Sequence, residues 1–194
     1  MKKLLFTLNP HAGRGAIRDC FLDLVDGFVR EGYDVTVHTT QKQGELPEYL
    51  AENAEKYEML VSSGGDGTLN ETVNGLMQCE DPPAFCYIPA GTVNDFATSL
   101  GISKEMKEAG KLVTEGVPFA CDVGRFGERY FSYVAAFGAF TEVSYMTPQE
   151  RKNLLGHQAY MLEGVKSLAN IKSYRMRAEA DDFCLEGDFI FGMV

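Results

Sequence analysis

The chain has 194 residues, of which 45% are hydrophobic, so it can bury a substantial core and is not an intrinsically disordered protein. Its net charge of −10 argues against a nucleic-acid-binding protein, because nothing would offset the repulsion between the protein and phosphates. Its five scattered cysteines lack the paired spacing of a zinc site and the density of a disulfide scaffold. No apolar run is long enough to span a bilayer, and we expect a cytoplasmic protein.

The first half of the chain alternates between strand-like and helix-like segments. Four segments have the apolar pattern of strands, namely 3–8, 33–40, 58–63 and 84–89. Helices are predicted over 17–30 and 45–56, from the turn after residue 63 to about Met77, and from about residue 95 to near Gly101. Strands that alternate with helices in this way predict βα units on a mainly parallel sheet.

The pattern changes after Gly116. Strands are predicted over 119–126 and 129–137 as a hairpin, a long helix over 149–170, and further strands over 173–180 and 183–194. We therefore predict a nucleotide-binding domain over 1–120 and a β-rich second domain over 121–194. Because the last strand, FIFGMV, stops within its apolar run, we expect the second domain to be incomplete.

Three glycine-containing loops follow predicted strands, namely NPHAGRG (9–15), SGGDGTLNE (63–71) and PAGTVND (89–95). In a parallel α/β sheet such loops lie at one edge, and each here precedes a helix whose first N–H groups can bind an anion. Glycine lets phosphate oxygens approach the backbone. Neither a GxxxxGK loop nor a GxGxxG loop at a strand–helix junction is present, so the prediction depends on all three loops together.

Three aspartates, Asp66, Asp95 and Asp122, lie at or just past predicted strand ends, with Glu71 nearby. Carboxylates beside a polyphosphate would repel it unless a cation lies between them, and Mg²⁺ is the expected cation. The pattern thus favours phosphoryl transfer from a nucleotide. In the structural alternative, the loops are plain tight turns, Asp66 and Asp95 are helix N-caps, and Asp122 is a strand-end residue with a backbone partner.

Taken together, these motifs resemble the diacylglycerol kinase catalytic-domain family, which includes bacterial lipid kinases, sphingosine kinases and ceramide kinases. NPHAGRG resembles the family's NPxxGxG-type loop, GGDGTLNETVNGL its GGDGTxNEVxNGL signature, and IPAGTVNDFATSLG its PxGTxNDFAxxLG. CDVGRFGERYFSYVAAFGAF resembles the run from the first domain into the second. The resemblance covers most of the chain, up to about residue 165.

The resemblance implies an α/β first domain with a phosphofructokinase/NAD-kinase-like fold, an antiparallel β-rich second domain, and ATP lying across the three loops. On the matching positions, the residues expected to bind ATP are Asn9, Pro10, Gly13, Thr40, Gly64, Gly65, Asp66, Gly67, Thr68, Leu69, Asn70, Thr92 and Asn94. Asp66, Asp95 and Asp122 match aspartates that organise Mg²⁺, mainly through water. The family's proposed general base, in an Asp-Gly-Glu motif, has no match here and is expected beyond Val194, so we expect this chain to be catalytically incomplete.

The resemblance also implies a lipid acceptor at the membrane surface, with diacylglycerol converted to phosphatidate. Segment 151–177 carries six Lys or Arg residues against Glu163, and it would suit an anionic inner leaflet or form an ordinary solvated surface. We expect a peripheral protein with no transmembrane segment and no nucleic-acid partner, in which a homodimer is possible. The alternatives are a soluble kinase of the NAD-kinase type, which shares GGDG, and a non-catalytic nucleotide-binding regulator.

Overall fold

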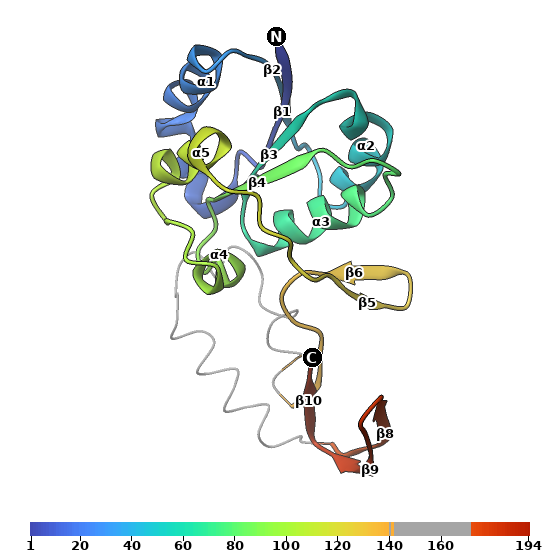
Figure 1. The fold of residues 1–194 in the computed structure, drawn as a ribbon. Helices are drawn as coiled ribbons and strands as arrows, with labels where there is room; N and C mark the ends of the chain where they lie inside the picture. Colours follow the sequence, from blue (N-terminus) through green and yellow to red (C-terminus); the bar gives the residue numbers. More distant parts are fainter. Residues whose placement is uncertain (140, 142–171) are drawn as a thin grey trace. The chain divides into compact units, whose positions relative to one another are not determined.

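The computed structural model describes residues 1–139, 141 and 172–194 (Figure 1). By its internal contacts the chain divides into two units, Met1–Tyr133 and Val134–Val194. The helix predicted over 149–170 lies outside the described residues, as does most of the basic segment 151–177. The domain boundary near residue 120 stays a prediction about the organisation of the whole protein.

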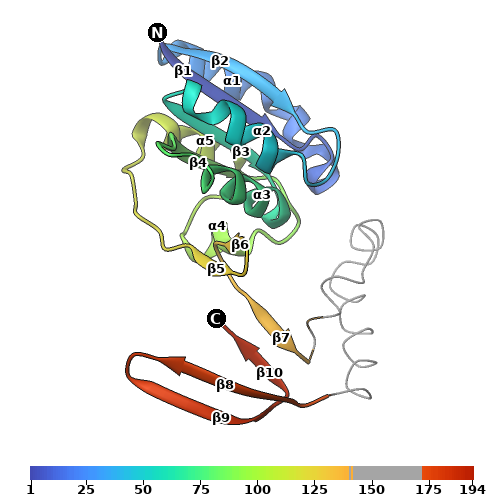
Figure 2. The same ribbon diagram turned by 90° about the vertical axis from the view of Figure 1, so that its right-hand side faces the viewer.

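The first unit is built on a four-stranded parallel sheet (Figure 2). Its strands are β1 (Lys2–Leu8), β2 (Tyr33–Thr39), β3 (Met59–Gly64) and β4 (Ala84–Pro89). They lie in the order β2-β1-β3-β4, and each neighbouring pair is parallel. The predicted strands match these bounds to within one residue at each end, and the predicted parallel α/β fold is confirmed.

Helices cover both faces of this sheet (Figures 1 and 2). They are η1 (Ala12–Asp19, 3₁₀), α1 (Phe21–Arg30), α2 (Leu46–Asn53), η2 (Ala54–Lys56, 3₁₀), α3 (Asp66–Leu76), α4 (Asp95–Ser99) and α5 (Met106–Glu115). The single helix predicted over 17–30 is wrong in its first turn, because the backbone at Cys20 is not helical and separates η1 from α1. Helix α5 was not among the helices predicted from the sequence. Within the described part of the chain, no helix is long and apolar enough to cross a membrane.

The core lies on both sides of the sheet, because alternate strand residues point to opposite faces and helices cover each face. Leu4 and Phe6 of β1 pack with side chains of η1, α1 and α5, whereas Leu5 between them packs with α2 and η2. The ring of Phe6 lies 5.9 Å from that of Phe21 and 5.7 Å from that of Phe28, between centroids. This two-sided burial explains why residues 4–8 of β1 are all buried and, apart from Thr7, all apolar.

The described strands after residue 120 are antiparallel and shorter than predicted. They are β5 (Gly124–Phe126) paired with β6 (Arg129–Phe131), β7 (Ala136–Gly138) paired with β10 (Phe191–Met193), and β8 (Tyr174–Ala180) paired with β9 (Phe183–Phe189). The predicted strand over 129–137 is wrong because β6 and β7 pair with different partners. The predicted strand over 183–194 is likewise two strands, separated at Ile190.

Helix α3 is attached to its neighbours through two residues near its end. The Asn74 side chain donates from Nδ2 to Tyr130 O (2.8 Å) and accepts from Tyr130 N at Oδ1 (2.9 Å), which fixes the β5–β6 hairpin against the helix. A Cβ on Gly75 would lie 2.7 Å from Leu50 Cβ, so glycine is needed where α2 contacts α3. Asn74 and Gly75, near the end of the GGDGTLNETVNGL motif, therefore have a structural role.

Leu24 and Leu22 of α1 provide a matched test of this core. Leu24 is 5% exposed and belongs to the core cluster, whereas Leu22 is 74% exposed. We expect Leu24→Ala to lower the free energy of unfolding by about 2–5 kcal/mol, through lost burial and a cavity. Leu22→Ala should change it by less than about 0.5 kcal/mol. Urea denaturation measures both, and equal losses would contradict the packing described.

Candidate active site

The three glycine loops meet at the carboxyl edge of the parallel sheet. Asn9 N donates to Ser63 O (2.9 Å), and Ala90 N donates to Gly64 O (2.8 Å). Gly13 has φ +51°, and a Cβ there would lie 2.0 Å from Ala90 O. The first and third loops are therefore in contact with each other, and both are bonded to the second.

The three glycines at the start of α3 differ in what surrounds them. A Cβ on Gly64 would lie 2.4 Å from Thr68 Cβ, and a Cβ on Gly65 would lie 3.3 Å from Gly91 Cα, a tight contact. The space beside Gly67 is open, since no heavy atom lies within 4 Å of where its Cβ would be, and the residue is exposed. Packing within the protein thus accounts for Gly64 and Gly65, but it does not account for Gly67.

Asp66 is the first residue of α3, after the N-cap Gly65. One carboxylate oxygen, Oδ2, accepts a hydrogen bond from Asn94 N (3.0 Å). The other, Oδ1, is buried and has no hydrogen-bond partner among the described residues. A buried carboxylate oxygen left unpaired is costly, so Oδ1 marks a position where a cation, a water or a ligand donor would bind.

The helix-cap alternative is wrong for both aspartates. The N-cap residues of α3 and α4 are Gly65 and Asn94, and Asp66 and Asp95 each occupy the first helical position. There the carboxylates still interact favourably with the positive end of the helix dipole. This charge effect leaves the side-chain oxygens free for other partners.

Asn94 organises the third loop. It is buried, and among the described non-glycine residues it is the one with positive φ (58°), a conformation that asparagine tolerates better than most residues. Its Oδ1 accepts from Gly91 N (2.9 Å) and its Nδ2 donates to Gly91 O (2.8 Å). The amide is therefore engaged within the loop, while the backbone N–H holds Asp66.

Tyr87 of β4 contacts both the second loop and Asn94 of the third loop. Its hydroxyl donates to Gly64 O (2.8 Å) and lies 3.5 Å from Asn94 Oδ1. Burial, with a further effect from the Asp66 charge, raises the pKa of Tyr87 far above its ordinary value, so the hydroxyl stays protonated and can donate. This role of Tyr87 could not be predicted from the sequence, because a tyrosine in an apolar strand is indistinguishable from a core residue.

Asp95 and Asp122 are exposed. Val123, next to Asp122, packs against the cluster that includes Leu69 of α3 and Phe96 of α4, so the chain at Asp122 passes beside both helices. Within the described ranges, no three His, Cys, Asp or Glu side chains gather closely enough to hold a metal ion. A Mg²⁺ ion here would therefore take few protein ligands and keep several waters, as is usual for this ion.

The other predicted site residues lie around the same edge. The Asn9 side chain accepts from His11 N (2.9 Å), and Thr40 N donates to Leu8 O (2.9 Å) at the end of β2. Leu69 and Thr68 are buried, and Leu69 N donates to Gly65 O within the helix. The remaining residues are placed on the three loops or in α3, with Thr92 and Asn70 exposed, and Pro10 half-buried.

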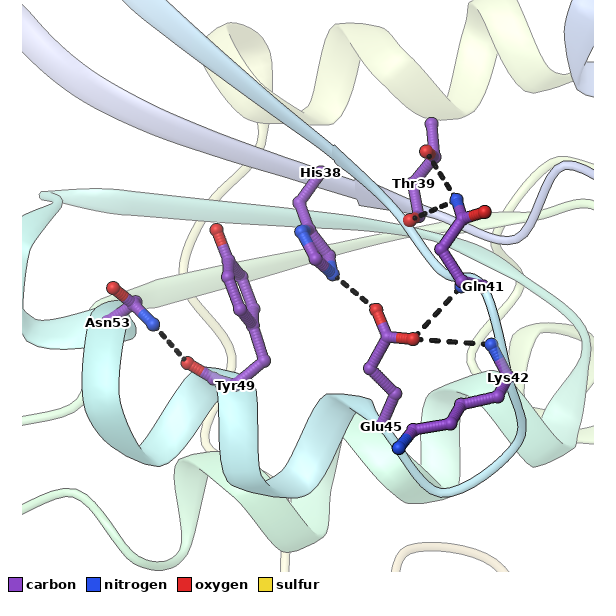
Figure 3. Close-up of polar contacts among 7 residues, drawn as sticks. All are labelled: His38, Thr39, Gln41, Lys42, Glu45, Tyr49 and Asn53. Atoms are coloured by element: carbon purple, nitrogen blue, oxygen red, sulfur yellow. Dashed lines mark hydrogen bonds and ion pairs between the residues drawn. The ribbon is translucent and has the colours of Figure 1, made fainter.

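Glu71 does not join the aspartates. Its Oε1 accepts a hydrogen bond from Gly44 N (2.9 Å), which links α3 to the loop after β2. That loop also contains a network around Glu45 that the sequence analysis missed (Figure 3). Its partners are mostly backbone N–H groups, which leave no pattern in the sequence.

Residues 3–126 match the model of the diacylglycerol kinase catalytic domain. This match covers more than half of the chain and includes all three loops. The chain belongs to the diacylglycerol kinase catalytic-domain family. The family assignment agrees with the resemblance noted from the motifs.

Relatives and solved structures agree with this assignment. The chain is 33% identical over 196 residues to the diacylglycerol kinases of Staphylococcus saprophyticus and of Bacillus subtilis strain 168, covering 99% and 100% of this chain. It spans only 64% and 65% of the length of those two curated relatives. A crystal structure of a diacylglycerol kinase from Bacillus anthracis superimposes with a TM-score of 0.80 at 28% identity, covering 99% of this chain and 63% of that one.

Asn94 offers a test of how the third loop is held. We expect Asn94→Ala to lower the free energy of unfolding by about 2–3 kcal/mol, from lost hydrogen bonds and a strained positive φ. Asn94→Gly loses the same side-chain bonds without that strain, and its loss should be about 1 kcal/mol smaller. Urea denaturation of both variants measures the difference; a larger loss for glycine would contradict the left-handed conformation.

Proposed function

We propose that the protein is an ATP- and Mg²⁺-dependent lipid kinase that transfers the γ-phosphoryl group of ATP to a lipid hydroxyl. Diacylglycerol is the expected acceptor and phosphatidate the expected product. Membership of the diacylglycerol kinase family supports the reaction class. The observation that carries the proposal is the first turn of α3, where Gly67 has open space beside it and Oδ1 of the preceding residue, Asp66, has no partner among the described residues.

This turn has the properties of a phosphate site. The first hydrogen bond of α3 runs from Leu69 N to Gly65 O, so the N–H groups before Leu69 have no acceptor within the helix. They lie at the positive end of the helix dipole, which favours an anion. The open side of Gly67 lets phosphate oxygens approach these amides.

Asp66 fits the role of holding Mg²⁺ or one of its waters. Asn94 N occupies Oδ2, so the carboxylate is oriented and only Oδ1 is left for the ion. Asp95 and Asp122 would act through water. Bound there, the ion would neutralise phosphate charge beside the carboxylates. We assign no general base among the described residues.

We infer that the protein is cytoplasmic and meets its lipid as a peripheral protein at the inner face of the membrane. In the described part of the basic segment, Arg175 pairs with Glu186 (3.2 Å) and Arg177 with Glu179 (2.8 Å). Both pairs are exposed and such pairs are weak, so either guanidinium could exchange its partner for a lipid phosphate. A homodimer stays a prediction.

Substitution of Gly67 separates a ligand role from a structural one. Alanine fits the open space in the helix, so we expect Gly67→Ala to keep or raise the free energy of unfolding, by up to about 1 kcal/mol. The new methyl group should raise the Kd for Mg·ATP at least about tenfold. Gly27→Ala in α1, also in open space, is the matched control and should leave the Kd unchanged. Wild-type affinity in Gly67→Ala would contradict the phosphate site.

The activity itself is tested by ³²P transfer from ATP to diacylglycerol in mixed micelles, with protein expressed from its complete gene. Asp66→Asn keeps the shape and one acceptor oxygen for Asn94 N but removes the charge, and we expect transfer to fall at least about 100-fold. Circular dichroism checks the fold of the variant. Transfer to NAD⁺ and to no lipid would favour the NAD-kinase type, and ATP binding without any transfer would favour a regulator.

A further inference from the structure

A second polar network lies around residues 40–45, here called the β2–α2 loop (Figure 3). His38 near the end of β2 and Tyr49 of α2 stack face to face, with ring centroids 3.6 Å apart and planes 12° apart. His38 Nε2 lies 2.7 Å from Glu45 Oε1. The two side chains of this pair are only 23% and 16% exposed.

The Glu45 carboxylate binds the backbone of its own loop. Its Oε2 accepts from Gln41 N (3.0 Å) and Lys42 N (3.2 Å). Glu45 is the N-cap residue of α2, yet its side chain makes no capping bond to that helix. The Gln41 N–H above all, then His38 and the Lys42 N–H, lower the pKa of Glu45, so the carboxylate is charged at neutral pH. Charge-assisted bonds of this kind are among the stronger hydrogen bonds in proteins.

Further hydrogen bonds hold the start of the β2–α2 loop, at Thr40 and Gln41. Thr40 N donates to Leu8 O of β1 (2.9 Å), and Gln41 Nε2 donates to both Thr39 O (2.9 Å) and Thr39 Oγ1 (3.0 Å). Further along, Gly44 N donates to Glu71 Oε1 in α3. Glu45 and Glu71 together therefore fix the loop between the end of β2 and the helix that begins at Asp66.

We propose that Glu45 is a positioning residue for the nucleotide, whose carboxylate fixes the β2–α2 loop so that Thr40 faces bound ATP. This inference rests on the proposed ATP site. A carboxylate that served only helix stability would bond to the first N–H groups of α2, and Glu45 instead bonds to the residues directly after Thr40. Glu71 connects the loop to the second turn of α3, the helix whose first turn is the proposed phosphate site. A displaced loop would therefore move Thr40 relative to that turn.

The primary test is the Kd for Mg·ATP of Glu45→Gln, measured by isothermal titration calorimetry on protein expressed from its complete gene. Glutamine keeps the size but loses the charge that the two backbone donors share, and we expect the Kd to rise about tenfold. Glu48→Gln, an exposed position in the first turn of α2, is the matched control and should bind as the wild type does. Glu45→Asp keeps the charge and should recover part of the affinity.

Steady-state kinetics distinguish a positioning role from a purely structural one, because a purely structural role would not raise the KM for ATP alone. In Glu45→Gln the KM for ATP should rise while kcat and the KM for diacylglycerol stay within about twofold of wild type, as for a loss of uniform ATP binding. A lowered melting temperature with an unchanged ATP Kd would overturn the proposal and leave Glu45 a structural residue. Gln41→Ala, which removes only the contacts to Thr39, is a milder variant, and its Kd should rise about threefold.

The outcomes separate this inference from the proposed function. If the wild type binds ATP and Glu45→Gln weakens that binding, the positioning role stands even when no lipid is phosphorylated. If Gly67→Ala weakens ATP binding and Glu45→Gln does not, the ATP site stands and the positioning role fails. If the wild type does not bind ATP, both fail.

Discussion

The hydrogen bond from Asn94 N to Asp66 Oδ2 is the contact on which the candidate site depends. It joins the third loop to the first turn of α3 and leaves Asp66 Oδ1 as the oxygen without a partner. For Asn94 to donate in this direction, its backbone adopts positive φ, and its own amide offsets the strain through two bonds to Gly91. The third loop is thus held by its own hydrogen bonds, and it in turn holds Asp66.

Helix α3 links this corner to the rest of the first unit. Its first turn offers the N–H groups and Asp66, its second turn holds the β2–α2 loop through Glu71, and Asn74 holds the β5–β6 hairpin. The single stretch 64–75 therefore combines the residues of the proposed ligand site with structural residues. This explains why the long motif is a stronger predictor of function than its glycines alone: Glu71, Asn74 and Gly75 fix the elements that pack against α3.

The sequence predicted the parts of the fold that depend on burial alone. Strands β1, β3 and β4 were placed to within one residue because they are mostly buried and rich in apolar residues, and the edge strand β2 because its residues alternate. The meeting of the three loops followed from parallel topology. Helix α5 was missed although Met106, Ala109 and Val113 have helical spacing, and the break between β6 and β7 could not be predicted because alternation does not identify a strand's partner. Glu45 was missed because its partners are mostly backbone N–H groups.

The central claim is that the three loops form one nucleotide site. Backbone amide NMR shifts on addition of a non-hydrolysable ATP analogue with Mg²⁺ test it most directly. The account predicts that amides in 9–15, 64–69 and 91–95 shift together, at one apparent Kd. Shifts confined to a single loop, or centred elsewhere in the first unit, would contradict it.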